Sequence, residues 1–268
     1  MKTSKISHLL SSLQRWPSIA VAFSGGVDSA FLLEAAIRAV GREKVLAITA
    51  ISPSFPQVER ENLQKLILEK DFPHRFLSTE ELSDPLYCQN DSLRCYYCKR
   101  QLFQTMRQYA TEQGIAILIE GSNADDAQVW RPGKKALEEL QIPSPLQELG
   151  FTKREIRECA AQWGLSVAEK PSVPCLATRI QYGISITREL LERIEQAEAH
   201  IRQIWDTKES FRVRVHEKEL LRLELSPTLF QTFLQTPEKR KGLIDALHRL
   251  GFRYLTLDLE GFRSGSFD

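Results

Sequence analysis

Two cysteines in the middle of the chain have the spacing of a reactive or metal-binding pair. Cys95 and Cys98 are separated by two tyrosines, and we expect them at the start of a helix that reaches Tyr109. A helix N-terminus favours the thiolate form and therefore lowers the pKa of a thiol. The spacing is typical of a redox pair, of half a metal site or of two incidental thiols. A thioredoxin-type pair would follow the first strand of its fold, and a zinc site would normally add a second Cys-x-x-Cys or a His pair, so the sequence favours neither.

Cys175 lies in an irregular, proline-rich segment, Pro171-Ser172-Val173-Pro174-Cys175-Leu176-Ala177-Thr178-Arg179. Arg179 is a cation suited to stabilising a thiolate or holding a phosphate, and a buried loop cysteine is the alternative interpretation. Cys159 falls on the apolar stripe of a helix, which predicts core packing. We assign no role to Cys88. An odd total of five cysteines, in a chain without an export signal, argues against a disulfide framework.

A second candidate site is the glycine-containing string Ser24-Gly25-Gly26-Val27-Asp28-Ser29, between a buried strand and a helix. Glycines let the backbone approach phosphate oxygens, and the N–H groups and dipole of the next helix favour an anion. Ser24 and Ser29 add hydroxyl donors. A Walker A loop would need a longer glycine spacing and a lysine, which are absent. A tight connection with a serine N-cap is the structural alternative.

Charged residues mark two further places. Asp125 and Asp126 follow a strand's carboxyl end, where they are suited to binding Mg²⁺ or adenosine; simple helix N-terminal charge explains them equally well. Arg212 and Arg214 alternate along a predicted strand, which places both guanidinium groups on one face while Val213 and Val215 face the core. A solvated edge strand explains that alternation equally well.

The elements that must position these residues fall into two sets. Near-continuous apolar strands at 18–23, 45–51, 74–77 and 115–120 alternate with helices at 28–40 and 57–70. This pattern predicts an α/β fold with a doubly wound parallel sheet, in which ligands bind beyond the carboxyl ends of the strands. After residue 151 we expect a smaller α+β unit, and we place the domain boundary near Gly183, which separates residues 1–183 from residues 184–268. The expected elements there are helices at 151–163 and 187–205, strands at 211–215, 220–225 and 254–257, and a helix at 228–250 broken near Pro237.

The composition excludes several classes of protein. Hydrophobic residues make up 42% and charged residues 26% of the 268 positions, which suits a folded chain with a proper core. Lys and Arg number 36 against 35 Asp and Glu, so a net charge of +1 exerts no general attraction on nucleic acid. Residues 1–16 lack the apolar core of a signal peptide, and no apolar stretch near them approaches the roughly 20 residues of a membrane span. We therefore expect a soluble, cytoplasmic protein without membrane or nucleic-acid partners.

The string from Ser24 to Ser29 resembles the pyrophosphate loop of the PP-loop ATP pyrophosphatases. The resemblance implies that ATP is cleaved between its α and β phosphates and that AMP is moved to a carbonyl or carboxyl oxygen. It also implies that Ser24, Gly25, Gly26, Asp28 and Ser29 hold the departing pyrophosphate, with Mg²⁺, and that residues 1–183 form the ATP-binding domain. The substrate is not specified by this loop.

Nearly the whole chain resembles, in colinear order, the LarE family. The segments that carry this resemblance are Gly121-Ser122-Asn123-Ala124-Asp125-Asp126, Arg131-Pro132-Gly133, Ser144-Pro145-Leu146, Phe151-Thr152-Lys153-Arg154-Glu155-Ile156-Arg157, Pro174-Cys175-Leu176-Ala177-Thr178-Arg179-Ile180, Ile194-Glu195-Gln196-Ala197-Glu198, Arg212-Val213-Arg214-Val215-His216 and Gly261-Phe262-Arg263-Ser264-Gly265-Ser266. The resemblance implies an ATP-dependent sulfur transferase that acts on pyridinium-3,5-biscarboxylic acid mononucleotide. Its carboxylates become thiocarboxylates, which later hold nickel in the pincer nucleotide of lactate racemase.

Cys175 matches the family's sulfur-delivering cysteine. In one branch of the family this cysteine is itself the sulfur donor and ends as dehydroalanine. In another branch two further cysteines join it as three ligands of a 4Fe-4S cluster, which leaves one iron free to carry an extra sulfide. Because this chain has Cys95 and Cys98, we predict the cluster branch, with Cys95, Cys98 and Cys175 as metal ligands.

The resemblance also favours Arg212 and Arg214 as substrate-binding residues, with Arg179, Arg263 and Glu198 as weaker candidates. It implies a homo-oligomer, with residues 184–268 serving substrate binding and assembly. The competing functions are a PP-loop tRNA thiolase, an amide-forming synthetase of the GMP or NAD type, and a non-catalytic nucleotide-binding module. A tRNA thiolase should show a basic surface or extra zinc-binding cysteine pairs, and a GMP-type synthetase does not need the three cysteines.

Overall fold

A computed structural model describes residues 2–128, 132–170 and 173–263. Four parts of the motif segments lie outside these residues: Arg131, Pro171, Ser172 and the run Ser264-Gly265-Ser266. The chain divides into two compact units. The first comprises Met1–Ser52, Gln57–Glu81 and Leu93–Val173, and the second comprises Pro53–Pro56, Leu82–Ser92 and Pro174–Asp268. The division of the chain into two domains near Gly183 stays a prediction.

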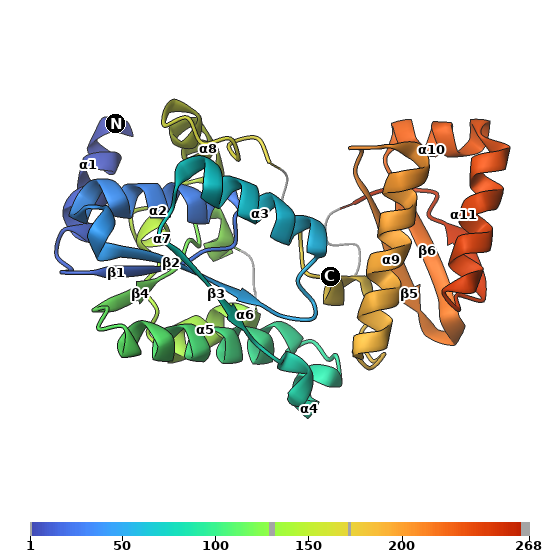
Figure 1. The fold of residues 1–268 in the computed structure, drawn as a ribbon, viewed down its shortest axis with the longest axis horizontal. Coiled ribbons are helices and arrows are strands. Elements are labelled where there is room, and N and C mark those ends of the chain that lie inside the picture. Colours follow the sequence, from blue (N-terminus) through green and yellow to red (C-terminus); the bar gives the residue numbers. More distant parts are fainter. Residues whose placement is uncertain (1, 129–131, 171–172, 264–268) are drawn as a thin grey trace. The chain divides into compact units, whose positions relative to one another are not determined.

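The first unit is built on a four-stranded parallel sheet in the order β3-β2-β1-β4 (Figure 1). Its strands are β1 (Ile19–Ala22), β2 (Val45–Ile51), β3 (His74–Ser78) and β4 (Ile117–Ile119). The central strand β1 pairs with a neighbour on each side, so Ile19 lies opposite both Val45 and Ile117. The carboxyl ends of all four strands therefore lie at one edge of the sheet, as the alternation of apolar strands with helices along the chain predicts.

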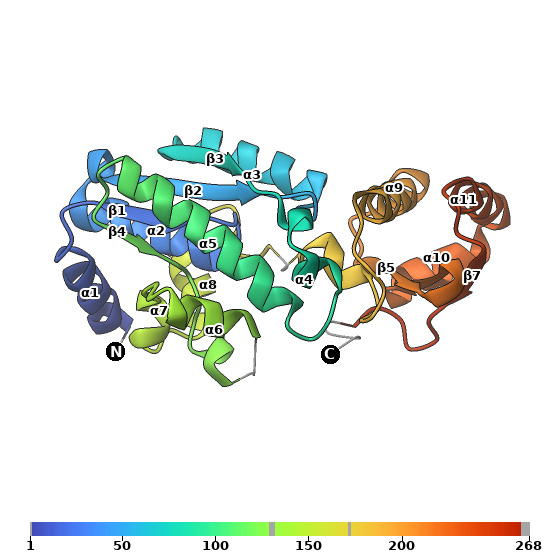
Figure 2. The same cartoon turned by 90° about the horizontal axis from the view of Figure 1, so that it is seen from below.

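Helices cover both faces of this sheet, and successive strand residues face opposite cores. Ile19 and Val21 pack in a core with α1 (Lys2–Leu13), α2 (Val27–Val40), α3 (Gln57–Lys70) and α8 (Lys153–Gln162). Ala20 packs in the second core with residues of α5 (Arg94–Glu112) and α6 (Pro132–Glu139), and Figure 2 shows α5 in front of the sheet. This is the doubly wound α/β architecture that the sequence predicts.

The second unit contains a three-stranded mixed sheet, β5-β6-β7. Strands β5 (Phe211–His216) and β6 (Leu220–Leu225) are antiparallel, and β7 (Tyr254–Leu257) runs parallel to β6. Its helices are α9 (Arg188–Trp205), α10 (Pro227–Gln235) and α11 (Pro237–Arg249). The predicted helical break near Pro237 is present, because that proline occupies the first turn of α11, where its missing N–H costs nothing.

The structure contains four helices that the sequence pattern did not predict: the 12-residue α1 and the shorter α4 (Pro85–Cys88), α6 and α7 (Pro145–Glu148). Three of them begin with a proline. Proline is favoured at the first position of a helix but also in turns, so it does not by itself predict a helix. Among the described residues, no helix combines the length and the apolar character needed to cross a membrane.

Candidate functional site

The loop after β1 leads the chain from the sheet into α2, and hydrogen bonds of two serine hydroxyls hold it together. The Ser29 hydroxyl accepts a hydrogen bond from Ser24 N at 3.3 Å and donates to Gly26 O at 3.1 Å. Ser24 Oγ lies 3.2 Å from Ser29 Oγ. Gly26 is the N-cap of α2 and no side chain caps that end. The first-turn N–H groups of a 14-residue helix therefore remain available to an anion, as the phosphate-loop interpretation requires.

Two glycines are needed for this geometry. Gly25 has a φ of +73° and is buried against α3, where an added Cβ would lie 2.5 Å from Leu63 Cδ1. Gly121, just beyond β4, lets the chain pass close to α2, because a Cβ there would lie 3.1 Å from Ser29 N. Larger residues at either position would displace the loop. The end of β4 and the start of α2 are thus in direct contact.

An ion pair stands at the start of α2. Asp28 Oδ2 contacts the ammonium of Lys153, and Asp28 Oδ1 accepts a hydrogen bond from Asn123 Nδ2 at 3.5 Å. The two side chains are 22% and 35% exposed, so the pair is accessible to a ligand. In the sequence Lys153 is part of a segment that carries the LarE resemblance, and no local pattern indicates a role for it. Because Lys153 is 125 residues from Asp28, no local pattern predicts their contact. The sequence indicates only that Lys153 lies at a helix start, directly after the N-cap Thr152.

Lys153 is held in place by the cap of α8. Thr152 and Glu155 form a capping box, and Lys5 Nζ reaches Glu155 at 2.9 Å. Hydrogen bonds from Lys5 and from Thr152 N hold the pKa of the Glu155 carboxyl below its ordinary value. The helix that carries Lys153 is therefore anchored at its first turn, beside the phosphate loop.

The two predicted aspartates act mainly as caps. Asn123 Oδ1 accepts hydrogen bonds from Asp125 N at 2.9 Å and Asp126 N at 3.3 Å. Asp126 Oδ2 accepts from Asn123 N, and Asp125 Oδ2 accepts from Lys153 N at 2.8 Å. Asp125 therefore caps α8 and also helps to fix Lys153. The helix-terminal interpretation of these carboxylates is visible in the structure, and a role for Asp125 in cofactor binding stays a prediction.

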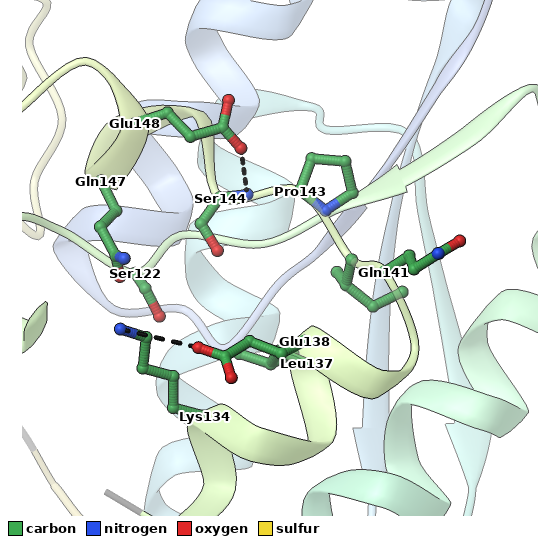
Figure 3. A pocket seen from close by; sticks show the side chains of 10 residues that line it. Ser122, Lys134, Leu137, Glu138, Gln141, Pro143, Ser144, Gln147 and Glu148 are labelled. Atoms are coloured by element: carbon green, nitrogen blue, oxygen red, sulfur yellow. Dashed lines mark hydrogen bonds and ion pairs between the residues drawn. The ribbon is translucent and has the colours of Figure 1, made fainter. Parts of the chain in front are cut away.

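A pocket of about 360 Å³ opens beside Ser122, between α6 and α7 (Figure 3). At its edge the buried Glu120 carboxylate accepts hydrogen bonds from the hydroxyls of Ser122 and Ser144. Ser144 N donates to Glu148 at 3.2 Å, and Lys134 pairs with Glu138 at 3.8 Å. Of the described residues, neither the phosphate loop nor any cysteine lines this pocket.

Cys95 and Cys98 lie in the first turns of α5, as predicted. Their i, i+3 spacing places both on one side of the helix, and both are half-buried. The intervening Tyr96 donates to Glu139 of α6 at 2.7 Å, which fixes this end of α5 against α6. Two partly accessible thiols on one helical face suit adjacent thiolate ligands of one iron-sulfur cluster.

Cys175 is half-buried and belongs to the second unit, directly before the 3₁₀ turn η4 (Leu176–Arg179). Its carbonyl accepts hydrogen bonds from the Thr178 hydroxyl at 2.7 Å and from Arg179 Nη1 at 3.2 Å. Arg179 is 2% exposed and pairs with Glu198 at 2.9 Å. Arg179 therefore fixes the backbone that carries Cys175, and Glu198 is its buried counterion.

Arg212 and Arg214 are both buried on β5, at 6% and 2% exposure. Arg214 pairs with the fully buried Glu224 at 3.1 Å and donates to Thr178 O at 2.6 Å. Arg212 packs over the Phe262 ring, and within the described ranges its guanidinium makes no hydrogen bond or ion pair. Burial, then the nearby charges of Arg179 and Arg214, lower the pKa of Arg212 to about 10.

Strand β5 lies at an edge of its sheet, but the interpretation that it is solvated is wrong, because Arg212 and Arg214 lie in the interior and Val213 and Val215 are buried as well. The one-face arrangement of the guanidinium groups is nevertheless the feature that brings Arg212 and Arg214 next to the turn after Cys175. A buried cation without a carboxylate partner is a candidate anion-binding group.

The remaining cysteines do not join a site in the described part of the chain. Cys159 is buried in the first core, as predicted. Cys88 donates to Leu82 O, and burial followed by the charge of Asp84 raises the pKa of its thiol. All five cysteines are described, and none forms a disulfide. Within residues 2–128, 132–170 and 173–263, no group of three His, Cys, Asp or Glu side chains is arranged to hold a metal ion.

A parallel sheet whose first strand leads through a hydroxyl-lined glycine loop into an uncapped helix defines a PP-loop-like α/β protein. Comparison with known proteins identifies the family within this class. The chain is 32% identical to the pyridinium-3,5-bisthiocarboxylic acid mononucleotide synthase of Lactiplantibacillus plantarum over 261 residues. The aligned region covers 97% of this chain and 92% of that protein. The chain therefore belongs to the LarE family.

Two other relatives are similar over almost their whole lengths. An uncharacterised protein of Synechocystis is 37% identical over 269 aligned positions, which cover 100% of this chain and 98% of the relative. An uncharacterised protein of Methanocaldococcus jannaschii is 26% identical, with 98% of each chain covered. No family model matches the chain. A synthase that spans nearly the whole chain supports an enzyme rather than a structural module.

Proposed function

We propose that this protein is an ATP-dependent sulfur transferase of nickel-pincer nucleotide biosynthesis. It adenylylates the carboxylates of pyridinium-3,5-biscarboxylic acid mononucleotide and converts them to thiocarboxylates. The observation that carries this proposal is the uncapped, hydroxyl-lined loop from Ser24 to Ser29, in a chain 32% identical to a pyridinium-3,5-bisthiocarboxylic acid mononucleotide synthase. The enzyme acts in the cytoplasm as a homo-oligomer.

In this proposal the first unit handles ATP. The N–H groups of Gly25, Gly26 and the first turn of α2, with the Ser24 and Ser29 hydroxyls, hold the pyrophosphate part. Asp28 is suited to Mg²⁺, which prefers carboxylate oxygen, and Asp125 contributes on the same side. The ammonium of Lys153, which contacts Asp28 beside this loop, is placed to neutralise a phosphate oxygen. A substrate carboxylate oxygen then attacks the α-phosphorus, and pyrophosphate leaves.

The second unit supplies the nucleotide substrate with cations. The substrate bears a phosphate and two carboxylates, and Arg212 is a buried cation without a carboxylate partner among the described residues. Binding an anion would replace the hydration that Arg212 has lost, whereas Arg214 already has Glu224. Arg212 is thus the main anion-binding residue and Arg214 supports it from the same face.

Sulfur reaches the acyl adenylate through the cysteines, and AMP leaves as the carbon–sulfur bond forms. Cys95, Cys98 and Cys175 are the thiolates that would hold a 4Fe-4S cluster. When bound, such a cluster supplies an iron with an open position for the sulfide to be transferred. The i, i+3 thiols of α5 fit two of these ligands, and Cys175 on its fixed backbone is the third.

The reaction is tested by mixing the protein with ATP and the pyridinium dicarboxylate nucleotide under anaerobic conditions. We expect pyrophosphate release that depends on the dicarboxylate, together with a product whose mass corresponds to replacement of carboxylate oxygen by sulfur. Release that depends instead on tRNA would identify a thiolase, and release of an amide product with ammonia would identify a synthetase. Absence of pyrophosphate with every substrate would reduce the protein to a nucleotide-binding module.

The cluster has its own test. Anaerobic reconstitution should give a brown protein whose iron and sulfide content corresponds to one 4Fe-4S cluster per chain. Cys95→Ala should lose that cluster, whereas the matched variant Cys88→Ala should retain it. A Cys95→Ala protein with a full cluster would reject the ligand assignment. Intact-mass analysis after turnover then distinguishes the two branches, because loss of H₂S from Cys175 marks a sacrificial donor.

A further inference from the structure

The end of β1 is shaped by two hydroxyl groups from other elements. Phe23 N makes the last ladder bond of β1, to Ile48 O at 2.8 Å. The next bond of a regular parallel ladder would bring a backbone N–H of β2 to Phe23 O. Within the described part of the chain no backbone group donates to that carbonyl, and the pairing of β1 with β2 ends at Ala22. Side chains take over from the ladder at this point.

The Thr49 hydroxyl of β2 donates to Phe23 O at 2.5 Å. One residue later Ser24 N donates to the Ser29 hydroxyl at 3.3 Å. The two backbone groups that leave the sheet are therefore both held by hydroxyls, one from β2 and one from α2. Thr49 is 2% exposed, so the Phe23 carbonyl lies in an interior where an unpaired acceptor is costly.

His74 of β3 fixes the direction of the Thr49 hydroxyl. Its Nε2 lies 2.8 Å from Thr49 Oγ1. Because a carbonyl can only accept, the single proton of the Thr49 hydroxyl points to Phe23 O, and Thr49 Oγ1 must accept from His74 Nε2–H. Burial lowers the pKa of His74 to about 4, so the ring is neutral near pH 7 and carries its proton on Nε2. The hydrogen bonds run in one direction, from β3 through β2 to β1.

We propose that Thr49 is a positioning residue for the phosphate loop, and that His74 acts through Thr49 to orient the last carbonyl before Ser24. This inference deepens the proposed function and rests on it, because the loop is the proposed pyrophosphate site. By holding the Phe23 carbonyl inside the sheet, Thr49 fixes the peptide whose Ser24 N–H bonds to the Ser29 hydroxyl, and with it the start of the turn that leads to the N–H groups of Gly25 and the first turn of α2. Neither residue touches the nucleotide.

The physical basis is the cost of leaving one buried acceptor, the Phe23 carbonyl, without its donor. Without the Thr49 hydroxyl, the Phe23 carbonyl loses its donor in a dry environment and must turn to find another. The peptide it shares with Ser24 would turn with it, which disturbs the bond from Ser24 N to the Ser29 hydroxyl and shifts the loop that follows. Since oriented backbone dipoles bind anions only when they converge, a small rotation weakens phosphate binding.

The test compares ATP binding among four variants of the full chain. Thr49→Val removes the hydroxyl at nearly constant shape, and Thr49→Ser keeps it. His74→Phe keeps the ring contacts with Phe23 and Phe76 but removes the donor to Thr49. Thr105→Val is the matched control, because it removes a hydroxyl that donates to a backbone carbonyl within α5 at 3.0 Å. Dissociation constants for Mg²⁺ with a non-hydrolysable ATP analogue are measured by calorimetry.

We expect Thr49→Val to weaken analogue binding by about tenfold or more, His74→Phe by about threefold, and Thr49→Ser and Thr105→Val by less than twofold. In the pyrophosphate assay the KM for ATP should rise in Thr49→Val, while the KM for the dicarboxylate nucleotide stays unchanged. Unchanged analogue binding by a folded Thr49→Val protein would overturn the inference, as would a loss in Thr49→Ser as large as in Thr49→Val. If the unaltered protein binds no ATP analogue, the proposed function fails and this inference fails with it. Should Thr49→Val not fold, binding by His74→Phe equal to that of the unaltered protein would be decisive against the inference.

Discussion

The phosphate loop of the first unit and the arginine cluster of the second unit are both suited to anions, but they are built in opposite ways. The loop offers N–H and hydroxyl groups at a helix start, with one partly exposed ion pair, Asp28–Lys153. The cluster consists of charges in a dry interior. Arg179, Arg212 and Arg214 are each at most 6% exposed, and they face Glu198 and Glu224, at 3% and 0%.

The difference lies in where the unbalanced charge resides. Three buried arginines against two buried carboxylates leave one positive charge in excess, and Arg212 is the arginine without an ion pair in the described ranges. The loop has no comparable excess, because Lys153 is matched by Asp28. The loop should therefore bind its ligand through the geometry of its N–H and hydroxyl groups. Substitutions there should affect ligand binding more than the free energy of unfolding. The cluster should couple its stability directly to its charges.

The largest effect should come from the carboxylate at the centre of the cluster. Glu224→Gln leaves Arg214 buried without its counterion, so the free energy of unfolding should fall by about 3–5 kcal/mol. Urea denaturation measures this loss. The double variant Arg214→Met with Glu224→Leu should recover most of it, since it removes both charges. A loss below about 1 kcal/mol in Glu224→Gln would mean that the cluster is better hydrated than its burial indicates.

Lys153 should show the reverse balance, with a large effect on catalysis and a small one on stability. Lys153→Met removes the ammonium beside the phosphate loop, and we expect kcat/KM for pyrophosphate release to fall about 100-fold. The unfolding free energy should change by less than about 1 kcal/mol, because partly exposed ion pairs contribute little. Arg154→Met is the control on the same helix turn, since Arg154 is 86% exposed. Equal kinetics in the two variants would remove Lys153 from the site.

Arg212 should separate stability from binding within the cluster. Arg212→Leu removes the excess buried charge, so the unfolding free energy should stay constant or rise by about 1 kcal/mol. The KM for the dicarboxylate nucleotide should rise about tenfold, while the KM for ATP is unchanged. Steady-state kinetics together with urea denaturation provide the check, with the exposed Arg253→Leu as the matched variant. A clear loss of stability in Arg212→Leu would show that Arg212 is a structural cation.

The smallest effect concerns His74 and pH. Its pKa is about 4 in the folded protein against an ordinary value of 6.5, so between these values the unfolded chain binds the extra proton. The stability contributed by neutral His74 is complete above pH 6.5 and declines as the pH falls toward 4. Allowing for partial hydration, we expect roughly 1–2 kcal/mol over this range. Urea denaturation at pH 7.5, 6 and 5 should show a steeper decline for the unaltered protein than for His74→Phe, and parallel curves would contradict this.

Much of the first unit could be predicted because its periodicity is unambiguous. The apolar strands, the helix after Ser29 and the phosphate loop are local patterns, and the alternation of strands with helices indicates a parallel sheet, whereas the strand order β3-β2-β1-β4 is known only from the structure. The helices α6 and α7 were missed because they are short and begin with prolines that also suit a turn. Their stability comes from packing of α6 against α5 and of α7 against α1, which no local pattern reveals.

Only those parts of the site that form contiguous sequence patterns could be predicted. The loop residues are contiguous, whereas Lys153 reaches Asp28 across 125 positions. Thr49 also gave no signal, because a threonine within a strand is an ordinary strand residue until the register places it beside Phe23 O. The alternation of Arg212 and Arg214 was visible, but which of them pairs with Glu224 depends on side-chain direction across β5 and β6.

The second unit is assembled from three separated stretches of chain, and this has a consequence for synthesis on the ribosome. The fully buried Asn90 donates its side-chain amide to the carbonyls of Gln181 and Ile184, which follow it by 91 and 94 positions. At about 5–20 residues per second, these partners emerge roughly 5–20 s after Asn90 itself. The nascent chain must keep the stretch 82–92 available during that delay. A fragment starting at residue 174 would lack it altogether, so a single proteolytic cut cannot liberate the complete unit.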